Sequence, residues 1–270
     1  MAATITSALT FFHEHAPDLA KLVKLVQCDE ASQIPVATYQ AITLVFPNAV
    51  VTMRNGLGVI SRLGTDSALS HASDGDRFPT IAFRESFRCP RDITNVLSKN
   101  FYSGELQAMR SANDHGQHLP RELSNHTSRS SVQWIEIPAR SHRQAGSSLV
   151  NTKEAEIVTK HIDALFASNY TGTVAVLSFY GAQKPVIVKA LSHHEERSEL
   201  FIGTVDCSQG REFDTVFVLL TRSDGQSSFI DDPRRVNVAL SRTKDWCFVV
   251  ASAEVIAGTT YWRRIKEMTR

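Results

Sequence analysis

The sequence predicts an α/β fold in which helices flank a parallel sheet, and two features of the chain indicate it. Short apolar runs occupy residues 173–179, 215–221 and 246–252, and a further run begins at Phe201. Strands that are apolar throughout are buried on both faces, as in parallel sheets. Segments with helical periodicity separate the runs, so strands and helices alternate from residue 132 onward, with right-handed crossovers.

Local signals define the other elements of this C-terminal part. Pro90 suits the first turn of a helix, and the alternation in VQWIEIP predicts a strand over residues 132–138. Polar stretches without a period predict two loops, at residues 107–130 and 139–152. The predicted helices cover residues 153–168, residues 180–196, a basic segment before residue 246, and residues 253–268.

The first 80 residues contain fewer elements. The pattern predicts a helix within residues 1–20, a strand from Leu22 to Cys28, a helix from Pro35 to Phe46 and a strand at residues 49–53. Residues 54–80 are rich in Gly, Ser, Asp and Arg and have no period, which predicts a loop.

Composition leaves several classes of partner open. The net charge is +1, so a nucleic-acid partner is neither demanded nor excluded. No apolar stretch has membrane-spanning length, and the first residues lack a positive leading region, so we expect no membrane partner and no secretory signal. The four cysteines are far apart, which disfavours a zinc site and fits reduced thiols in a cytoplasmic or nuclear protein. The histidines show no ligand spacing, and His193 and His194 are expected to be solvated.

Polar residues gather where two predicted strands end. Asp29 and Glu30 follow an apolar strand, an arrangement that suits a Mg²⁺ ligand beside a general base, although a solvated helix cap is an alternative. Thr204 and the segment from Gln209 to Glu212 follow the apolar run that begins at Phe201. Because ligands of open parallel sheets bind beyond the carboxyl ends of the strands, we expect these residues to lie there.

Five blocks in this order resemble superfamily 1 helicases. The blocks are DEASQ, SFRCP with NFYSGEL, SFYGAQ, TVDCSQGREFD and DPRRVNVALSRTK. The closest branch is the Upf1-like family, which contains the nonsense-mediated-decay RNA helicase and the Dna2-type and Sen1-type enzymes. This resemblance implies a RecA-like, P-loop NTPase-like helicase fold. Residues 81–270 would be the second RecA-like domain, and residues 1–80 the C-terminal remnant of the first.

The resemblance implies roles for several residues around ATP and Mg²⁺. Asp29 matches the Mg²⁺ ligand, Glu30 the general base, Arg88 the arginine that reaches the γ-phosphate, Glu212 the ribose contact and Arg242 the arginine finger. Guanidinium groups suit this role because phosphoryl transfer spreads negative charge over several oxygens.

Further residues match parts of the family that touch nucleotide or nucleic acid. Nucleotide contacts are expected at Phe87, Gln209, Gly210 and Arg211, and contacts to the nucleic-acid backbone at Ser178, Tyr180 and Thr204. Such helicases grip phosphates and stack bases, with little reading of base identity.

Each assignment has a structural alternative. Arg242 lies near Arg234, Arg235 and Lys244 and could belong to an ordinary basic helix face. The pair Gln209–Gly210 could simply make a tight turn, since glycine tolerates positive φ. Phe87 could stack on adenine or fill the core.

The chain also departs from the family. No GxxxxGK[ST] phosphate-binding loop occurs in it, and the family places that loop before the DE pair, so we expect it upstream of Met1. The expected Gly-Asp-x-x-Gln-Leu block corresponds to VVTMRNGLGVI and is degenerate. We therefore expect an ATP-dependent helicase portion that acts on single-stranded RNA or DNA and is inactive alone. A non-catalytic nucleic-acid- or protein-binding module and a structural remnant are the alternatives.

Overall fold

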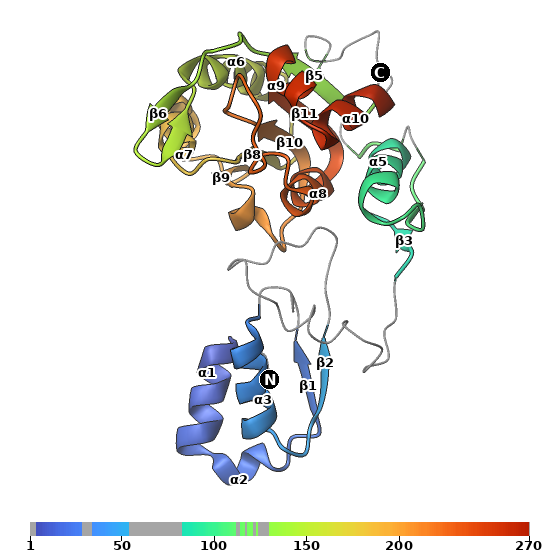
Figure 1. The fold of residues 1–270 in the computed structure, drawn as a ribbon, viewed down its shortest axis with the longest axis vertical. Helices are drawn as coiled ribbons and strands as arrows, with labels where there is room; N and C mark the ends of the chain where they lie inside the picture. Colours follow the sequence, from blue (N-terminus) through green and yellow to red (C-terminus); the bar gives the residue numbers. More distant parts are fainter. Residues whose placement is uncertain are drawn as a thin grey trace. The chain divides into compact units, whose positions relative to one another are not determined.

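The computed structural model describes residues 4–28, 34–53, 83–111, 114–116, 118–120, 123 and 130–269. The chain forms two compact units, residues 1–82 and 83–270, and each unit has its own parallel sheet (Figure 1).

The first unit is a small α/β layer. Its sheet consists of two parallel strands, with Leu25 opposite Val50. In chain order the elements are α1 (Ile5–Thr10), a π-helical segment (Phe11–His15), α2 (Pro17–Ala20), β1 (Leu25–Cys28), α3 (Val36–Val45) and β2 (Val50–Met53). The predicted helices and both strands of this part are confirmed.

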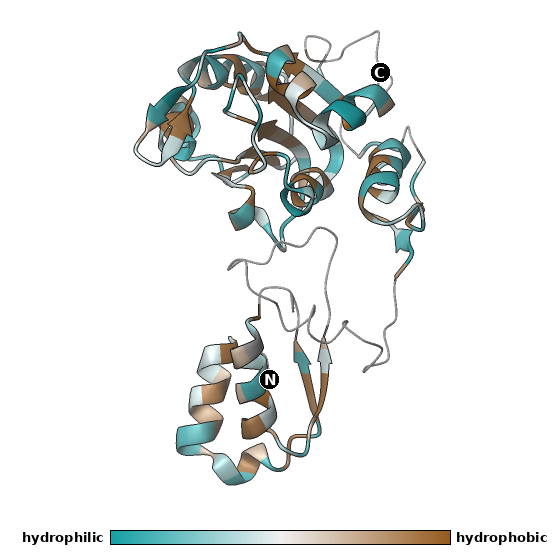
Figure 2. Cartoon of the chain, in the orientation of Figure 1, coloured by the Kyte–Doolittle hydropathy of each residue, from teal (hydrophilic) through white to brown (hydrophobic). Residues whose placement is uncertain are grey.

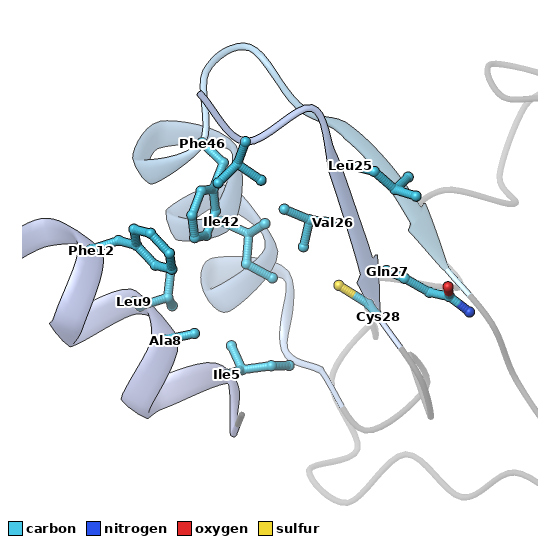
Figure 3. A pocket seen from close by; sticks show the side chains of 11 residues that line it. Ile5, Ala8, Leu9, Phe12, Leu25, Val26, Gln27, Cys28, Ile42 and Phe46 are labelled. Atoms are coloured by element: carbon cyan, nitrogen blue, oxygen red, sulfur yellow. The ribbon is translucent and has the colours of Figure 1, made fainter. Parts of the chain in front are cut away.

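The two faces of this small sheet differ in burial. Val26 and Cys28 point toward α1 and α3 and line an apolar pocket of about 300 Å³, while Leu25 and Gln27 point to the other side of β1 (Figure 3). Leu25 and its neighbour Val50 are 58 % and 64 % exposed. Among the residues of the first unit that the structure describes, one face of the sheet is therefore exposed.

The second unit is built on a five-stranded sheet in the order β5-β11-β10-β8-β9, in which every pair is parallel. The strands are β5 (Val132–Glu136), β8 (Val174–Ser178), β9 (Leu200–Thr204), β10 (Phe213–Leu219) and β11 (Thr243–Ala251). Strands β8 and β10 are central and almost completely buried, and Figure 2 shows the sheet coloured as hydrophobic. This is the predicted RecA-like α/β fold.

Helices cover both faces of this sheet. The helices are α5 (Arg91–Phe101), α6 (Thr152–Ala167), α7 (Gln183–Ala190), α8 (Pro233–Ser241), α9 (Ala253–Gly258) and α10 (Tyr261–Met268). Phe217 and Leu219 of β10 pack in one cluster with residues of α6 and α7. Successive strand residues point to opposite faces, so the buried Val216 and Val218 belong to the other face. That face is covered by α8, against which α5 and α10 pack.

Three sequence predictions need correction. The predicted loop at 139–152 contains an antiparallel hairpin, β6 (Arg143–Ala145) and β7 (Ser148–Val150), with Gly146 at a φ of +61° in its turn. Strands of three residues are too short to show a period. The predicted final helix is two helices, because Thr259 is extended. The predicted helix at 180–196 is α7 followed by a 3₁₀ turn, Ser192–His194.

Two-residue strands β3 (Glu85–Ser86) and β4 (Gln107–Ala108) complete the second unit, and they pair in parallel beside α5. Across the described parts of both units, no helix combines the length and the apolar character that a membrane crossing needs.

Phe217 gives a direct test of the core. Its side chain is completely buried and stacks on Phe248 with 4.7 Å between ring centroids. We expect Phe217→Ala to lower the free energy of unfolding by about 3–5 kcal/mol, because the cavity adds to the lost burial. Urea denaturation measures this. Val188→Ala, on the exposed side of α7, is the control and should change stability by less than about 0.5 kcal/mol. Equal losses in the two variants would contradict this core.

Candidate nucleotide and nucleic-acid site

Residues from three distant motifs meet where β10 and β11 begin. The Nε of Arg88 donates to Oε2 of Glu212 at 2.8 Å, and its Nη1 donates to the carbonyl of Ser241 at 3.0 Å. The side chains of Arg88 and Glu212 are 24 % and 51 % exposed, so the ion pair lies at the surface and is screened by water. Two acceptors from different elements thus fix the direction of the Arg88 guanidinium.

Arg242 directly follows Ser241, whose carbonyl accepts the second hydrogen bond of Arg88. It is the C-cap of α8, and its carbonyl accepts from the N–H of Phe213 at 2.9 Å. Its Nη1 donates to the carbonyl of Arg211 at 3.2 Å, and its Nη2 donates to Oγ of Ser241 at 3.1 Å. The residue is only 2 % exposed. The alternative of an ordinary basic helix face is therefore wrong for Arg242.

Helix α8 begins at a strong N-cap and ends directly before Arg242. Asp232 is the N-cap and its side chain accepts from the N–H groups of Arg234 and Arg235, with Pro233 in the first turn. Apolar residues of the helix are buried against the sheet. The turn into β11 then leaves Arg242 at the amino end of that strand.

The position of this cluster corrects one expectation. Arg211 and Glu212 do not lie beyond the carboxyl end of a strand, since they immediately precede β10. After Thr204 the chain runs back along the sheet through a 3₁₀ turn at Asp206–Ser208 and reaches the amino end of β10. Gly210 has a φ of +79° in this return, as the turn interpretation predicts.

The other nucleotide candidates lie around the same segment. The guanidinium of Arg211 covers the ring of Phe201 at 4.6 Å, and Gln209 is half-buried. Phe87 is 68 % exposed, so the alternative in which it fills the core is wrong. An exposed ring next to Arg88 has a face free for stacking.

Arg110 supports this cluster and was missed by sequence reasoning. Its Nη1 donates to the carbonyls of Arg88 and Lys244, at 2.6 and 2.7 Å, and its Nη2 donates to Asp245 at 2.8 Å. The side chains of Asp245 and Arg110 are 3 % and 18 % exposed, so the carboxylate of this ion pair is buried and the guanidinium is partly buried. A single arginine in a polar loop carries no sequence signal. Its role depends on contacts with Arg88 and Asp245, which lie 22 and 135 residues away in the sequence.

Cys89 fixes the start of α5 against β11. Its Sγ donates to the carbonyl of Thr243 at 3.0 Å, and complete burial raises the pKa of the thiol to about 12. The thiol therefore stays protonated and acts as a structural donor that holds the SFRCP segment beside Arg242.

The nucleic-acid candidates lie at the other edge of the sheet, at the carboxyl ends of β8 and β9. Ser178 and Thr204 are partners in register there. The Ser178 hydroxyl is buried, donates to the carbonyl of Tyr180 at 3.0 Å and accepts from its N–H at 3.1 Å. Thr204 is half-buried, and its Oγ1 accepts from the N–H of Cys207. Ser178 shapes the turn, while Thr204 and Tyr180 keep some surface.

An aromatic and cationic patch adjoins Tyr180. The rings of Tyr180 and Phe229 lie 5.2 Å apart, and the Arg235 guanidinium covers Phe229 at 4.5 Å. Phe229 is 38 % exposed, and Arg235 also pairs with Asp206 at 3.2 Å. Rings and guanidinium planes of this kind can stack bases. Sequence reasoning missed Phe229, although it stands just before the DPRR segment that carried the resemblance.

A buried polar network supports the turn after β10. Glu154 is fully buried, and its carboxyl accepts from the N–H of Thr221 at 2.8 Å and from Nε2 of Gln183 at 2.9 Å. Asn151 donates to the Thr221 carbonyl at 3.1 Å and caps α6. Thr221 has a φ of +62°, which these bonds hold in place. Burial raises the pKa of Glu154 to about 8, although hydrogen bonds from Thr221 and Gln183 lower it.

Two predicted elements lie outside the described residues. These are Asp29 and Glu30, the candidate Mg²⁺ ligand and general base, and the degenerate block around residues 54–58. Their roles stay predictions.

Comparison with known proteins identifies the family. A family model described as AAA domain matches residues 65–254. The chain belongs to this family. Its curated relatives confirm the resemblance to Upf1-like superfamily 1 helicases.

The relatives are larger proteins. An uncharacterized ATP-dependent helicase of Caenorhabditis elegans is 26 % identical over 98 % of this chain and 19 % of its own length. The DNA-binding protein SMUBP-2 of Mesocricetus auratus is 28 % identical over 78 % of this chain and 22 % of its own length. A regulator of nonsense transcripts 1 homolog of Neurospora crassa is 24 % identical, with 70 % and 18 % covered. The chain spans about a fifth of the length of these relatives.

The buried Glu154 carboxyl makes stability depend on pH. Its folded-state pKa of about 8 lies above the ordinary value of 4.5, so between these values the folded chain holds one proton more than the unfolded chain. Stability should therefore fall as pH rises from about 5 to 8, by at most about 1.4 kcal/mol per pH unit. Glu154→Gln has no such titration. Urea denaturation of both proteins at several pH values should show a widening difference in favour of the variant, and parallel curves would contradict the assignment.

Proposed function

We propose that this chain carries the arginine-bearing RecA-like domain of a superfamily 1 ATP-dependent helicase. Residues 81–270 form that second domain, and residues 1–80 belong to the tail of the first. The observation that carries the proposal is the convergence of Arg88, Glu212 and Arg242 at the start of β10 and β11. The uncovered face around Leu25 and Val50 supports the second part, because a buried parallel sheet needs cover on both faces.

The donor set fits a nucleoside triphosphate. Arg88 and Arg242 supply two guanidinium groups, which suit phosphate oxygens and the charge that spreads over them in phosphoryl transfer. Arg242 is buried and would exchange its bonds to the Arg211 carbonyl and to Oγ of Ser241 for the phosphate contact. Glu212 holds Arg88 through its carboxylate and would exchange this contact for a ribose hydroxyl. The second bond of Arg88, to the Ser241 carbonyl, keeps its guanidinium close to the backbone of Arg242. Phe87 offers its exposed ring to adenine.

The Mg²⁺ assignment rests on the sequence resemblance. Asp29 would be a ligand and Glu30 the general base, and Mg²⁺ bound with ATP would neutralise charge on the phosphates. Arg88 and Arg242 of this chain would orient the nucleotide and neutralise negative charge on its phosphates.

We place single-stranded RNA or DNA at the opposite edge of the sheet. Thr204 and Tyr180 would meet the backbone there, with Ser178 shaping their turn. Phe229 and Arg235 add a stacking surface next to Tyr180. The two sites thus lie at opposite ends of the strands, and the segment Val205–Glu212 joins them along the chain. This separation also supports a second function, nucleic-acid binding without catalysis.

The chain alone should not hydrolyse ATP. Its 270 residues contain no GxxxxGK[ST], so the backbone cradle and lysine for the β- and γ-phosphates are not part of it. We expect turnover at background with long single-stranded RNA, for the wild type and for Arg242→Ala alike, in a phosphate-release assay. RNA-stimulated turnover that disappears in Arg242→Ala would contradict the prediction that the chain alone is inactive, but it would support the role proposed for Arg242. Stimulated turnover that survives in Arg242→Ala would contradict that role.

Nucleic-acid binding should be measurable with the chain alone. We expect Phe229→Ala to weaken binding of a fluorescent single-stranded oligonucleotide by about tenfold, since base stacking contributes roughly 1–3 kcal/mol per base. Anisotropy titrations at two salt concentrations, with RNA and with DNA, measure this and should show weaker binding at higher salt. Phe11→Ala, an exposed phenylalanine of the first unit, is the matched control. Equal affinities for wild type and Phe229→Ala would contradict the stacking surface.

A further inference from the structure

Two histidines and an aspartate meet on the helical layer formed by α6 and α7. Asp163 lies in α6, and His193 and His194 form the end of the 3₁₀ turn that follows α7. The Nε2 atoms of both histidines lie 2.8 Å from the same carboxylate oxygen, Oδ1 of Asp163. All three potential ligand atoms lie within 4.8 Å of one another. The expectation that both histidines are simply solvated is wrong.

The cluster is held in place by packing beneath it. His194 is 13 % exposed at its side chain and meets the ring of Phe166 edge-on, with 5.1 Å between centroids. Phe166 and Leu191 belong to the core cluster between α6, α7 and the sheet. The backbone that carries the three ligands is therefore fixed by buried residues on both helices, which favours a preformed site.

The charged partners of Asp163 are the two histidines. Among the described salt bridges, the partners of Asp163 are His193 and His194, and no lysine or arginine pairs with it. Arg197 lies over the ring of Phe166, at 4.3 Å from its centroid.

We propose that Asp163, His193 and His194 form a binding site for a transition-metal dication of the zinc type. Two imidazole nitrogens and one carboxylate oxygen suit Zn²⁺, with water in the open fourth position. Zn–N bonds of about 2.0–2.1 Å require ligand atoms roughly 3.3 Å apart, so the two 2.8 Å contacts need to widen by about half an ångström. Each histidine then carries its proton on Nδ1, and no electron is transferred.

The bound metal would tie α6 to the turn after α7. These ligands come from positions 30 and 31 residues apart, and the layer they join covers the face of the sheet opposite to α8. The site is thus separate from Arg88, Glu212 and Arg242. A metal ion that cross-links these two segments would stabilise the second unit independently of any nucleotide.

Zinc titration of the full chain tests the site. The background is Cys207→Ser, which removes the exposed thiol. At about pH 7.5 we expect one Zn²⁺ per chain by calorimetry, at least about tenfold weaker binding in Asp163→Asn and in His193→Ala, and a rise in melting temperature with zinc that both variants lose. His161→Ala is the matched control, a histidine of α6 that bonds to the Ile157 carbonyl and should leave binding unchanged.

His193 is half-exposed, so its replacement leaves the fold intact and keeps the test valid if Asp163→Asn unfolds. Zinc binding that is equal in the background protein and in His193→Ala would overturn the proposal. Absence of binding at millimolar zinc would overturn it as well, and would leave the cluster as a hydrogen-bonded link between two helices.

Discussion

The parallel pairing of β10 with β11 is the constraint on which the candidate nucleotide site depends. The N–H of Phe213 donates to the carbonyl of Arg242, and this bond aligns the amino ends of the two strands. Glu212 and Arg242 each precede one of these strands by a single residue. Their proximity therefore follows from sheet register, and Arg88 joins them through bonds to Glu212 and to the Ser241 carbonyl.

Buried polar groups make this edge specific. Arg110 is partly buried and bridges the SFRCP segment and the start of β11, and its partner Asp245 is buried. A buried ion pair contributes little net stability compared with apolar packing, but the loss of either partner leaves an unpaired charge. The Glu154 network acts similarly at the opposite edge, where it holds the strained backbone of Thr221. Both ends of the sheet are thus fixed by polar contacts that span distant parts of the chain.

The separation of the two candidate sites has a mechanical consequence. Nucleotide candidates precede β10 and β11, and nucleic-acid candidates lie at the carboxyl ends of β8 and β9. The segment Val205–Glu212 connects them, and Arg235 on α8 reaches it through Asp206. A shift of Glu212 on nucleotide binding would therefore act on one end of a short segment whose other end adjoins Thr204. This short path connects the two candidate sites directly along the chain.

The sequence by itself determined the class of fold, the sites of most strands and helices, and the membership of the family. Apolar runs such as that of β10 are local signals, and the motifs that contain Arg88, Glu212 and Arg242 can be recognised from the sequence alone. Only the tertiary structure decided that Arg242 is buried, that Arg110 contacts the Arg88 backbone and Phe229 lies under Arg235, and that Asp163 faces His193 and His194. Each of these facts depends on contacts between residues far apart in the chain, which strand register and helix packing create and no local pattern contains.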